Sequence, residues 1–313
     1  MNITVRNFLQ KNKEKFVNKS TKEYHRNIPK AKPLPKAKPL TNKPTKIDQC
    51  FVIITDVHSY QRDKKAFDLC LKALPILNDQ YNVTKVVQLG DLLEGGEISN
   101  HPITNVYDVV PSYADELQWA VDEFWNPVMA AFPNSNFYAL MGNHEDRINR
   151  WLAKRLGACE LSQSMFDEYS PKNLYEDMGI HVTPYGNENI NEGVLELFPK
   201  LLCIHGWSYA VNAATVHLSR VMGGNSLIFG HINRSQSHIK RNPIGNESVG
   251  AWSFGALAKT NLLYQRGQPC DHTLGIGLVL THKDSFQIIP IQINARSKGG
   301  CKMLLPTGTV VEN

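Results

Sequence analysis

The sequence has no apolar run long enough to cross a membrane and no Cys-x-x-Cys pair. Its apolar stretches all fall short of about 18 residues, the minimum for a membrane-spanning helix, and no early segment resembles a signal peptide. The six cysteines are scattered, and several lie in apolar runs, where a free thiol behaves as a small hydrophobic residue. We therefore expect a cytoplasmic protein with no membrane partner.

The net positive charge of the chain comes from its start. At 313 residues and 42% hydrophobic content, the chain can form one large domain with a sizeable core and an appendage. Residues 1–48 hold 13 Lys and Arg and 3 Asp and Glu, a balance of 13−3=+10. The remainder holds 34−13=21 basic and 29−3=26 acidic residues, a balance of −5. A polyanionic partner would thus be attracted by the appendage and not by the net charge of the domain.

The appendage is unsuited to a folded core. Residues 29–46 repeat Ala-Lys-Pro-Leu and contain five prolines, which lack a backbone donor and favour an extended chain. We predict that residues 1–48 form a flexible basic N-terminal arm and Pro/Lys-rich linker. Two interpretations stay open: a plain spacer, or an arm that binds nucleic acid or another acidic partner.

Five apolar runs each end in a polar residue. The residues that follow them are Asp56 and His58, Asp91, Asn143 and His144, His205, and His231 with Asn233. Short apolar runs are typical of buried strands in α/β proteins, whose ligands gather beyond the strand C-termini. Asp, His and Asn are all ligand types for a centre of two metals, so five such endings in one chain predict a metal site.

The remaining pattern alternates helices with strands. Helical patterns occupy residues 62–80, 113–131, 145–156 and 209–221. Later strand patterns occupy residues 249–257, 274–281 and 286–293, with the last two joined as a hairpin. This order predicts an α/β chain with sheets packed together and helices outside. We assign a catalytic domain to residues 49–293 and a loose C-terminal tail to residues 294–313.

These motifs resemble a known family. Asp56-x-His58, Gly90-Asp91, Gly142-Asn-His-Glu145, His205 and Gly230-His-x-Asn233 are similar to the motifs of calcineurin-like metallophosphoesterases, over roughly residues 50–293. Gly142-Asn-His-Glu-Asp-Arg147 looks like the small stand-alone enzymes of bacteria and phages. The resemblance implies a four-layer αββα sandwich (α/β, α+β) with a two-metal site. It also implies one metal held by Asp56, His58 and Asp91, and another held by Asp91, Asn143, His205 and His231.

The residue types suit that chemistry. Two cations about 3.5 to 4 Å apart can clamp a phosphate and generate a hydroxide nucleophile near neutral pH. A carboxylate must bridge them, and by position it is Asp91. Imidazole and amide ligands keep the pair electrophilic, and such mixed sites accept Mn²⁺, Fe, Zn²⁺ or Ni²⁺. We expect two divalent metal ions, with Mn²⁺ first among them.

The resemblance also implies catalytic roles, and the sequence departs from the family pattern at one ligand position. It implies that His144 protonates the leaving group or stabilises transition-state charge, with Glu94 as its orienting carboxylate in place of the family's Asp. Asn233 stands where many members have a second histidine that ligates the first metal. An amide oxygen binds more weakly than imidazole, so we expect the metal at Asp56 and His58 to be held less tightly.

Substrate contacts are the least constrained part of the sequence. Arg147 could steer phosphate or lie on a solvated helix face, and His101 lies in a long loop directly after Asp91. The preferred hypothesis is a phosphodiesterase acting on nucleic acid or nucleotides by attack of a metal-bound hydroxide. Phosphomonoester or phosphoprotein hydrolysis by the same centre, and a non-catalytic scaffold, are the alternatives.

Overall fold

The computed structural model describes residues 47–100, 109–186, 191–221, 224–241, 247–260, 270–296 and 299–313. All of them belong to one unit of the chain, which begins at Lys46. His101 and residues 1–46 of the predicted arm lie outside the described residues.

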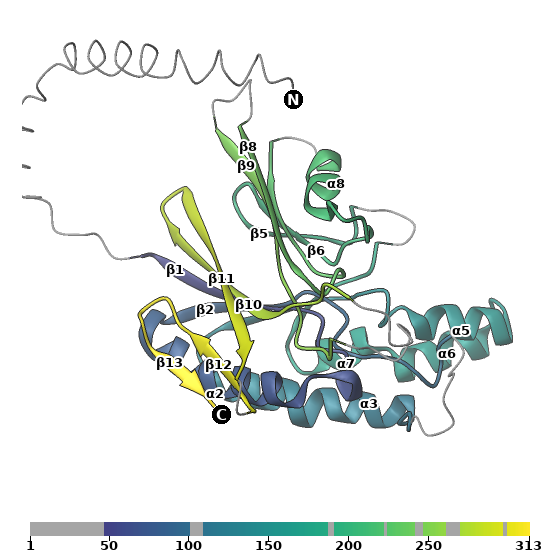
Figure 1. Ribbon diagram of the computed structural model, residues 1–313. Helices are drawn as coiled ribbons and strands as arrows, with labels where there is room; N and C mark the ends of the chain where they lie inside the picture. The colour runs from purple at the N-terminus through teal and green to yellow at the C-terminus, as the bar shows by residue number, and fades with distance from the viewer. Residues whose placement is uncertain are drawn as a thin grey trace, which may run out of the picture. The chain divides into compact units, whose positions relative to one another are not determined.

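Two sheets form the middle of this unit (Figure 1). The large sheet has the strand order β13-β12-β11-β10-β1-β2-β3-β4, and the small sheet has the order β5-β6-β7-β9-β8. The strands of the large sheet are β1 (Gln49–Ile54), β2 (Val83–Gln88), β3 (Asn136–Leu140), β4 (His181–Thr183), β10 (Leu274–His282), β11 (Ser285–Ala295), β12 (Cys301–Leu304) and β13 (Val310–Glu312). Those of the small sheet are β5 (Val194–Phe198), β6 (Leu201–Ile204), β7 (Ser226–Phe229), β8 (Ser235–Arg241) and β9 (Ser248–Phe254).

Parallel pairing is concentrated where the predicted polar residues follow strands. β1, β2, β3 and β4 pair in parallel in that order, while β10 joins β1 antiparallel. In the small sheet β6, β7 and β9 are parallel, and β5 and β8 are antiparallel edge strands. The C-terminal ends of β1, β2 and β3 therefore lie at the same end of the large sheet. Those of β6 and β7 lie at the same end of the small sheet.

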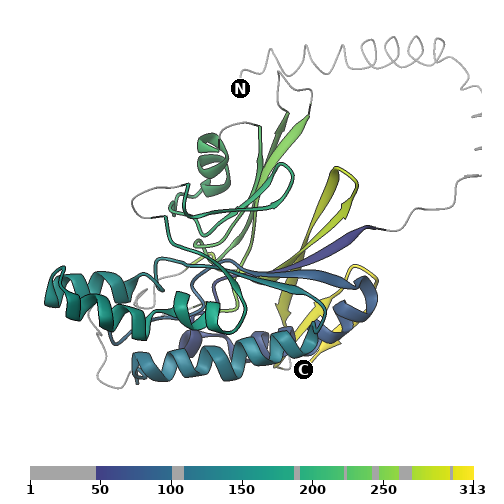
Figure 2. The same cartoon turned by 180° about the vertical axis from the view of Figure 1, so that it is seen from behind.

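Helices cover both outer faces. They are α2 (Lys64–Tyr81), α3 (Tyr113–Trp119), α4 (Asn126–Ala131), α5 (Arg147–Leu156), α6 (Glu160–Tyr169), α7 (Pro171–Asp177) and α8 (Ala213–Arg220). A short 3-10 turn, η1 (Ser59–Gln61), precedes α2, and a π-helical segment, η2 (Ala120–Trp125), joins α3 to α4. The blue and teal helices lie along the large sheet in both ribbon views (Figures 1 and 2), whereas α8 packs on the small sheet.

Three apolar cores separate four layers, which confirms the predicted αββα sandwich. β1 shows how its continuous apolar run serves two of them. Cys50, Val52 and Ile54 face the helices, whereas Phe51 and Ile53 face the small sheet, because successive side chains of a strand point to opposite faces. A third core lies between the small sheet and α8.

The prediction of a loose tail over residues 294–313 was wrong. β11 continues to Ala295, and β12 and β13 then extend the large sheet by antiparallel pairing. Cys301, Met303 and Val311 alternate with exposed neighbours and are buried against the helix layer. The composition of residues 294–313, polar and glycine-containing, suggested a tail. Pairing with β11 and burial of these three side chains instead hold the segment in the sheet.

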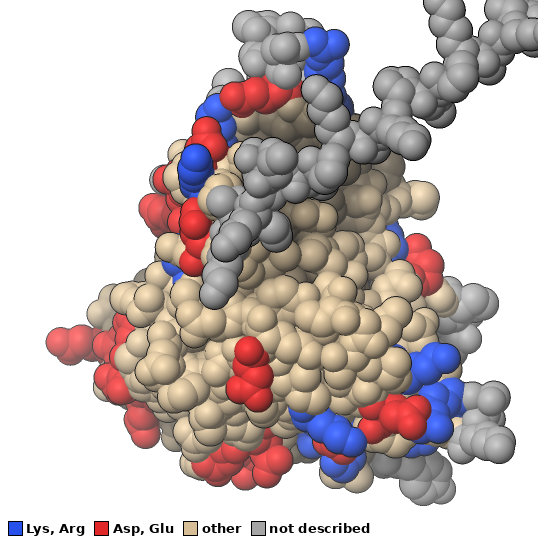
Figure 3. Space-filling model, turned by 90° about the vertical axis from the view of Figure 1, so that its left-hand side faces the viewer, with Lys and Arg blue, Asp and Glu red and all other residues tan. Residues whose placement is uncertain are grey.

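In the part of the chain that the structure describes, no helix combines the length and apolar character that crossing a bilayer requires. The face at the left of Figure 1 is turned to the viewer in Figure 3. Lys and Arg there lie in small groups beside Asp and Glu near the margins, and no continuous basic tract of described residues crosses this face.

Candidate metal centre

Loops from both sheets carry the predicted ligands. The loops after β1, β2 and β3 hold Asp56, His58, Asp91 and Asn143. The loops after β6 and β7 hold His205, His231 and Asn233. Each set of loops follows neighbouring parallel strands, so its side chains gather at one end of its sheet. The two sheets therefore bring the predicted ligands together between them.

Short distances join the two sets. Asp91 Oδ2 lies 3.2 Å from His205 Nε2. Asn143 Oδ1 lies 3.0 Å from the same nitrogen and 2.8 Å from His231 Nδ1. The backbone N–H of His231 donates a 2.8 Å hydrogen bond to Asp56 Oδ1. The small sheet is thus linked to the large one through the side chains of the candidate centre itself.

Two groups of donor atoms share one carboxylate. Asp56, His58 and Asp91 each offer a donor atom within 4.8 Å of the others, and so do Asp91, His205 and His231. Asp91 belongs to both groups, the position that a bridging ligand requires. These groups coincide with the two ligand sets that the family resemblance implies, with Asn143 beside the second.

Buried atoms without a protein partner favour a cation here. His58 Nε2, His231 Nε2 and Asn233 Oδ1 are buried and have no hydrogen-bond partner. Buried polar atoms are normally satisfied, so an unpartnered atom on each of these predicted ligands needs an explanation. Carboxylate, imidazole and amide donors together suit divalent transition metals. The residues therefore fit a metal centre.

Hydrogen bonds outside the ligand groups fix two histidine rings. Leu89 O accepts a 2.7 Å hydrogen bond from His205 Nδ1, which leaves Nε2 facing Asp91 and Asn143. The Glu94 carboxylate accepts a 2.8 Å hydrogen bond from His58 Nδ1, which leaves Nε2 with a free lone pair. A metal-ligating histidine commonly donates its other N–H in this way, and the bond sets its tautomer and orientation.

The backbone is unusual at the ligands. Five of them have a positive φ: Asp56 (48°), His58 (56°), Asp91 (53°), His231 (72°) and Asn233 (54°). This left-handed conformation is uncommon outside glycine and costs of order 1–3 kcal/mol per residue. The surrounding packing and hydrogen bonds stabilise this left-handed conformation. The conformation ends each strand abruptly and turns its polar side chain inward.

Gly142 is required by close approach. A Cβ at this position would lie 2.2 Å from Asp91 Oδ1 and 2.5 Å from Asp91 N. Any side chain would therefore displace the shared carboxylate. The glycine that ends the apolar run before Asn143 is part of the site's geometry as well as a strand terminator.

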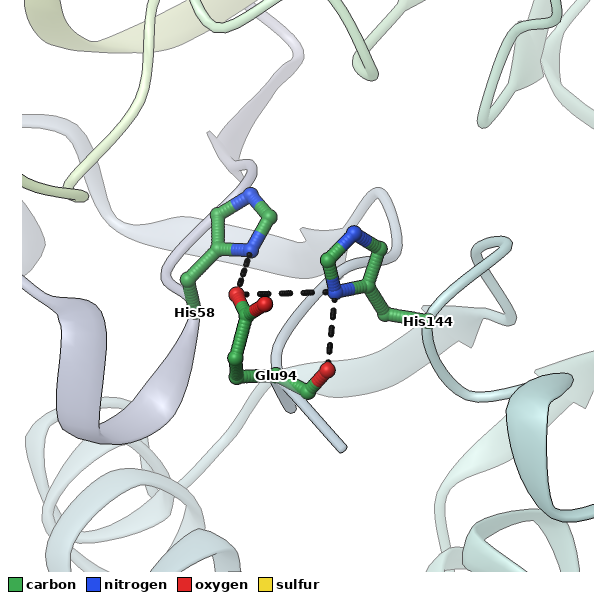
Figure 4. Close-up of side chains that lie close together, drawn as sticks. All are labelled: His58, Glu94 and His144. Carbon is green, nitrogen blue, oxygen red and sulfur yellow. Dashed lines mark hydrogen bonds and ion pairs between the residues drawn. The ribbon is translucent and has the colours of Figure 1, made fainter. Parts of the chain in front are cut away.

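Glu94 lies between two histidines (Figure 4). Its carboxylate oxygen is 2.8 Å from His58 Nδ1 and 3.5 Å from His144 Nδ1. The closer partner of His144 Nδ1 is the backbone oxygen of Glu94, at 3.0 Å. The structure brings Glu94 and His144 together, but the carboxylate is closer to His58, which the sequence did not indicate.

Burial and neighbouring charge act oppositely on the central groups. Burial alone would raise the pKa of the Asp91 carboxyl, but His144 and His205 hold it well below its usual range. Burial lowers the pKa of His144 to about 4, and the nearby carboxylates only partly oppose this. At neutral pH the centre accordingly combines an ionised Asp91 with a neutral His144.

Sequence comparison decides the family. Residues 51–241 match the family model described as calcineurin-like phosphoesterase. This chain belongs to that family. A search of curated proteins gives no match. Structural comparison finds Vps29 of Chaetomium thermophilum, at 10% identity and a TM-score of 0.42, with 85% of this chain and 93% of that chain covered. It also finds the nuclease MPE of Pseudomonas putida, at 13% identity and a TM-score of 0.32, covering 74% and 84%.

In this calcineurin-like phosphoesterase Arg147 is directed inward. Its side chain is only 12% exposed, and Nη1 lies 3.4 Å from a Glu94 carboxylate oxygen. Nη2 lies 3.1 Å from His144 Nε2. Because a guanidinium can only donate, His144 accepts at Nε2 and carries its proton on Nδ1, facing the Glu94 carbonyl. The alternative of a solvated helix face is wrong for this residue.

Glu145 has a role that the sequence did not suggest. We expected it in the first turn of a helix, but α5 begins only at Arg147. The buried Glu145 carboxylate instead accepts hydrogen bonds of 2.8–2.9 Å from the backbone N–H groups of Asp91, Leu93 and Gly142. It ties the loop after β2 to the loop after β3. Only tertiary structure could identify these partners.

Two tyrosines lie beside predicted ligands and were also missed by the sequence analysis. The Tyr209 ring lies 3.9 Å from the His231 ring between centroids, although the residue is 65% exposed. Tyr185 meets His205 edge to face at 6.1 Å. The sequence placed Tyr209 at the start of a helix, but α8 begins at Ala213, and Tyr209 belongs to the loop after β6. No local sequence signal marks either residue.

Proposed function

We propose that this protein is a phosphodiesterase that hydrolyses nucleic acid or nucleotide esters. It would use two divalent cations, for which Mn²⁺ is the first choice. The supporting observation is the pair of donor groups that share Asp91, with His144 and Arg147 beside them. Bound cations would polarise a phosphoryl oxygen and make a water acidic enough to attack near neutral pH.

The protein's own residues position the substrate. His144 Nε2 lies 3.9 Å from Asp91 Oδ2 and therefore faces the shared carboxylate. The hydrogen bond from His144 Nδ1 to the Glu94 carbonyl holds the ring in that direction. A phosphate at the centre would replace Arg147 as the partner of His144 Nε2. Arg147 would then stabilise the phosphate's charge. The negative phosphate would favour a second proton on His144, taken from solvent at Nε2, and that proton would pass to the departing oxygen.

Hydrolysis of chromogenic esters tests the proposal. We expect the full chain with added Mn²⁺ to release p-nitrophenol from bis(p-nitrophenyl) phosphate faster than from p-nitrophenyl phosphate, and chelation to abolish both reactions. Faster turnover of the monoester would favour a phosphomonoesterase or protein phosphatase. Bound metal without turnover of either ester would favour a scaffold and would contradict the proposal.

The basic arm supports a nucleic-acid substrate. Residues 1–48 carry a balance of +10, whereas the rest carries −5, so the arm can raise the local concentration of a polyanion. We expect deletion of residues 1–46 to leave hydrolysis of a small diester unchanged. Binding of DNA or RNA should weaken and become less salt-dependent, because fewer counterions are released. Fluorescence anisotropy at several salt concentrations measures this, and unchanged affinity and salt slope would show that the arm is only a spacer.

A further inference from the structure

A cavity opens beside the candidate metal centre. Its volume is about 420 Å³, within the usual range for ligand pockets. His205 contributes to its wall and also belongs to the donor group with Asp91 and His231. A phosphate held at that group would therefore direct one of its ester substituents into the cavity.

The described walls are aromatic and apolar, with a single cationic side chain. Met141, Pro184 and Ile204 contribute apolar surface, and Tyr185 and Trp207 contribute rings. Arg220, the last residue of α8, supplies the positive charge and lies 5.9 Å from the Trp207 ring centroid. No Asp or Glu is among the described lining residues. The cavity thus suits a flat ligand with hydrogen-bond acceptors and no positive charge.

The backbone of Trp207 is held by hydrogen bonds on the protein side. The backbone N–H of Trp207 donates a 3.1 Å bond to His217 Nε2, and His217 Nδ1 in turn donates a 2.8 Å bond to Ala213 O. These bonds hold Trp207 in position before any ligand arrives, so little ordering of its backbone accompanies binding.

We propose that this cavity binds an unpaired nucleobase joined through its sugar to the scissile phosphate. The base would stack on Trp207 or Tyr185 and turn its acceptor edge toward Arg220. This inference rests on the proposed function and names its substrate class: single-stranded or mononucleotide diesters, because a base in a duplex is stacked and paired and cannot enter a side pocket.

The lining residues also bear on which ester substituent of the phosphate the cavity would hold. His144, the proposed proton donor to the leaving group, belongs to the donor group with His58 and Glu94. His205 lines the cavity, whereas His144 is not among its described lining residues. The leaving group therefore departs near His144, and the nucleoside in the cavity stays on the phosphate.

Two diesters with one leaving group provide the test. Thymidine 5′-(p-nitrophenyl phosphate) carries a base on the retained side, and methyl p-nitrophenyl phosphate carries none. The quantity measured is the ratio of their kcat/KM values for the full chain with Mn²⁺. We expect Trp207→Leu and Arg220→Gln each to reduce this ratio by roughly 5- to 100-fold, the usual worth of a stacking contact to a base.

Arg155→Gln is the matched control. Arg155 lies 5.7 Å from the Trp151 ring, in the same kind of contact as Arg220 with Trp207, but it does not line the cavity. Its replacement should leave the ratio unchanged. If Trp207→Leu and Arg220→Gln also leave the ratio unchanged while both diesters are hydrolysed, the cavity is not a base pocket and the proposed function stands.

Direct binding separates the two proposals when hydrolysis fails. Quenching of tryptophan fluorescence by thymidine 5′-monophosphate needs no turnover. If the wild type hydrolyses neither diester, the proposed function is wrong. Quenching that is lost in Arg220→Gln but kept in Arg155→Gln would still support the pocket, and no quenching of the wild type would overturn it as well.

Discussion

Replacing Asp91 with asparagine is expected to remove bound metal and phosphoester hydrolysis together. Asp91 is the carboxylate common to the two donor groups, and its pKa is held well below the usual range, so the native side chain is charged. An amide keeps the shape and one acceptor oxygen, which can still receive the 3.1 Å hydrogen bond from His144 N. The loops should therefore stay folded while the shared charge is lost.

Activity in Asp91→Asn should fall by more than the roughly 10- to 100-fold that loss of an outer-shell partner costs. Elemental analysis and diester hydrolysis, measured on the same preparation, check the two losses together. Asp68→Asn is the control, because Asp68 is exposed on α2 and pairs with Lys64 at 2.7 Å. Retention of full metal content and activity by Asp91→Asn would show that Asp91 is not the bridge.

His144→Ala is expected to separate metal binding from rate. The ring contacts Glu94 and Arg147 and is absent from both donor groups that share Asp91. Its removal should leave metal content unchanged and reduce kcat by roughly 10² to 10⁴, the usual contribution of general acid–base catalysis. The hydrogen bond to Asp91 comes from the backbone N–H of residue 144, so alanine preserves it.

His238→Ala is the matched control for this prediction, because His238 lies on the edge strand β8, and it should change neither metal content nor kcat. Loss of metal from His144→Ala would mean that the ring is itself a ligand, contrary to the role proposed here. An unchanged rate would mean that protonation of the leaving group comes from elsewhere.

Strand ends and ligand types could be predicted from the sequence because both signals are local. The run from Phe51 to Ile54 supplies a strand buried on both faces, and Asp56 follows where the strand must stop. The same holds for Asp91 after β2 and His205 after β6. The αββα fold followed from this repetition together with the family resemblance.

Features that depend on partners distant in sequence could not be predicted. β12 is four residues long and depends on pairing with β11, so its composition looked like that of a tail. Glu145 fits a helix N-terminus locally, yet its carboxylate binds amides of the loop after β2. Arg147 lies on a helix of polar composition, and only the fold turns it toward Glu94.

The metal content of the purified full chain tests the two-cation centre most directly. After saturation with Mn²⁺ and removal of free ions, we predict two ions per chain. Mild chelation should remove first the ion at Asp56 and His58, because an amide oxygen at Asn233 is a weaker ligand than imidazole, and hydrolysis should fall with it. A chain that binds no metal, or that hydrolyses phosphodiesters undiminished after complete chelation, would contradict this centre.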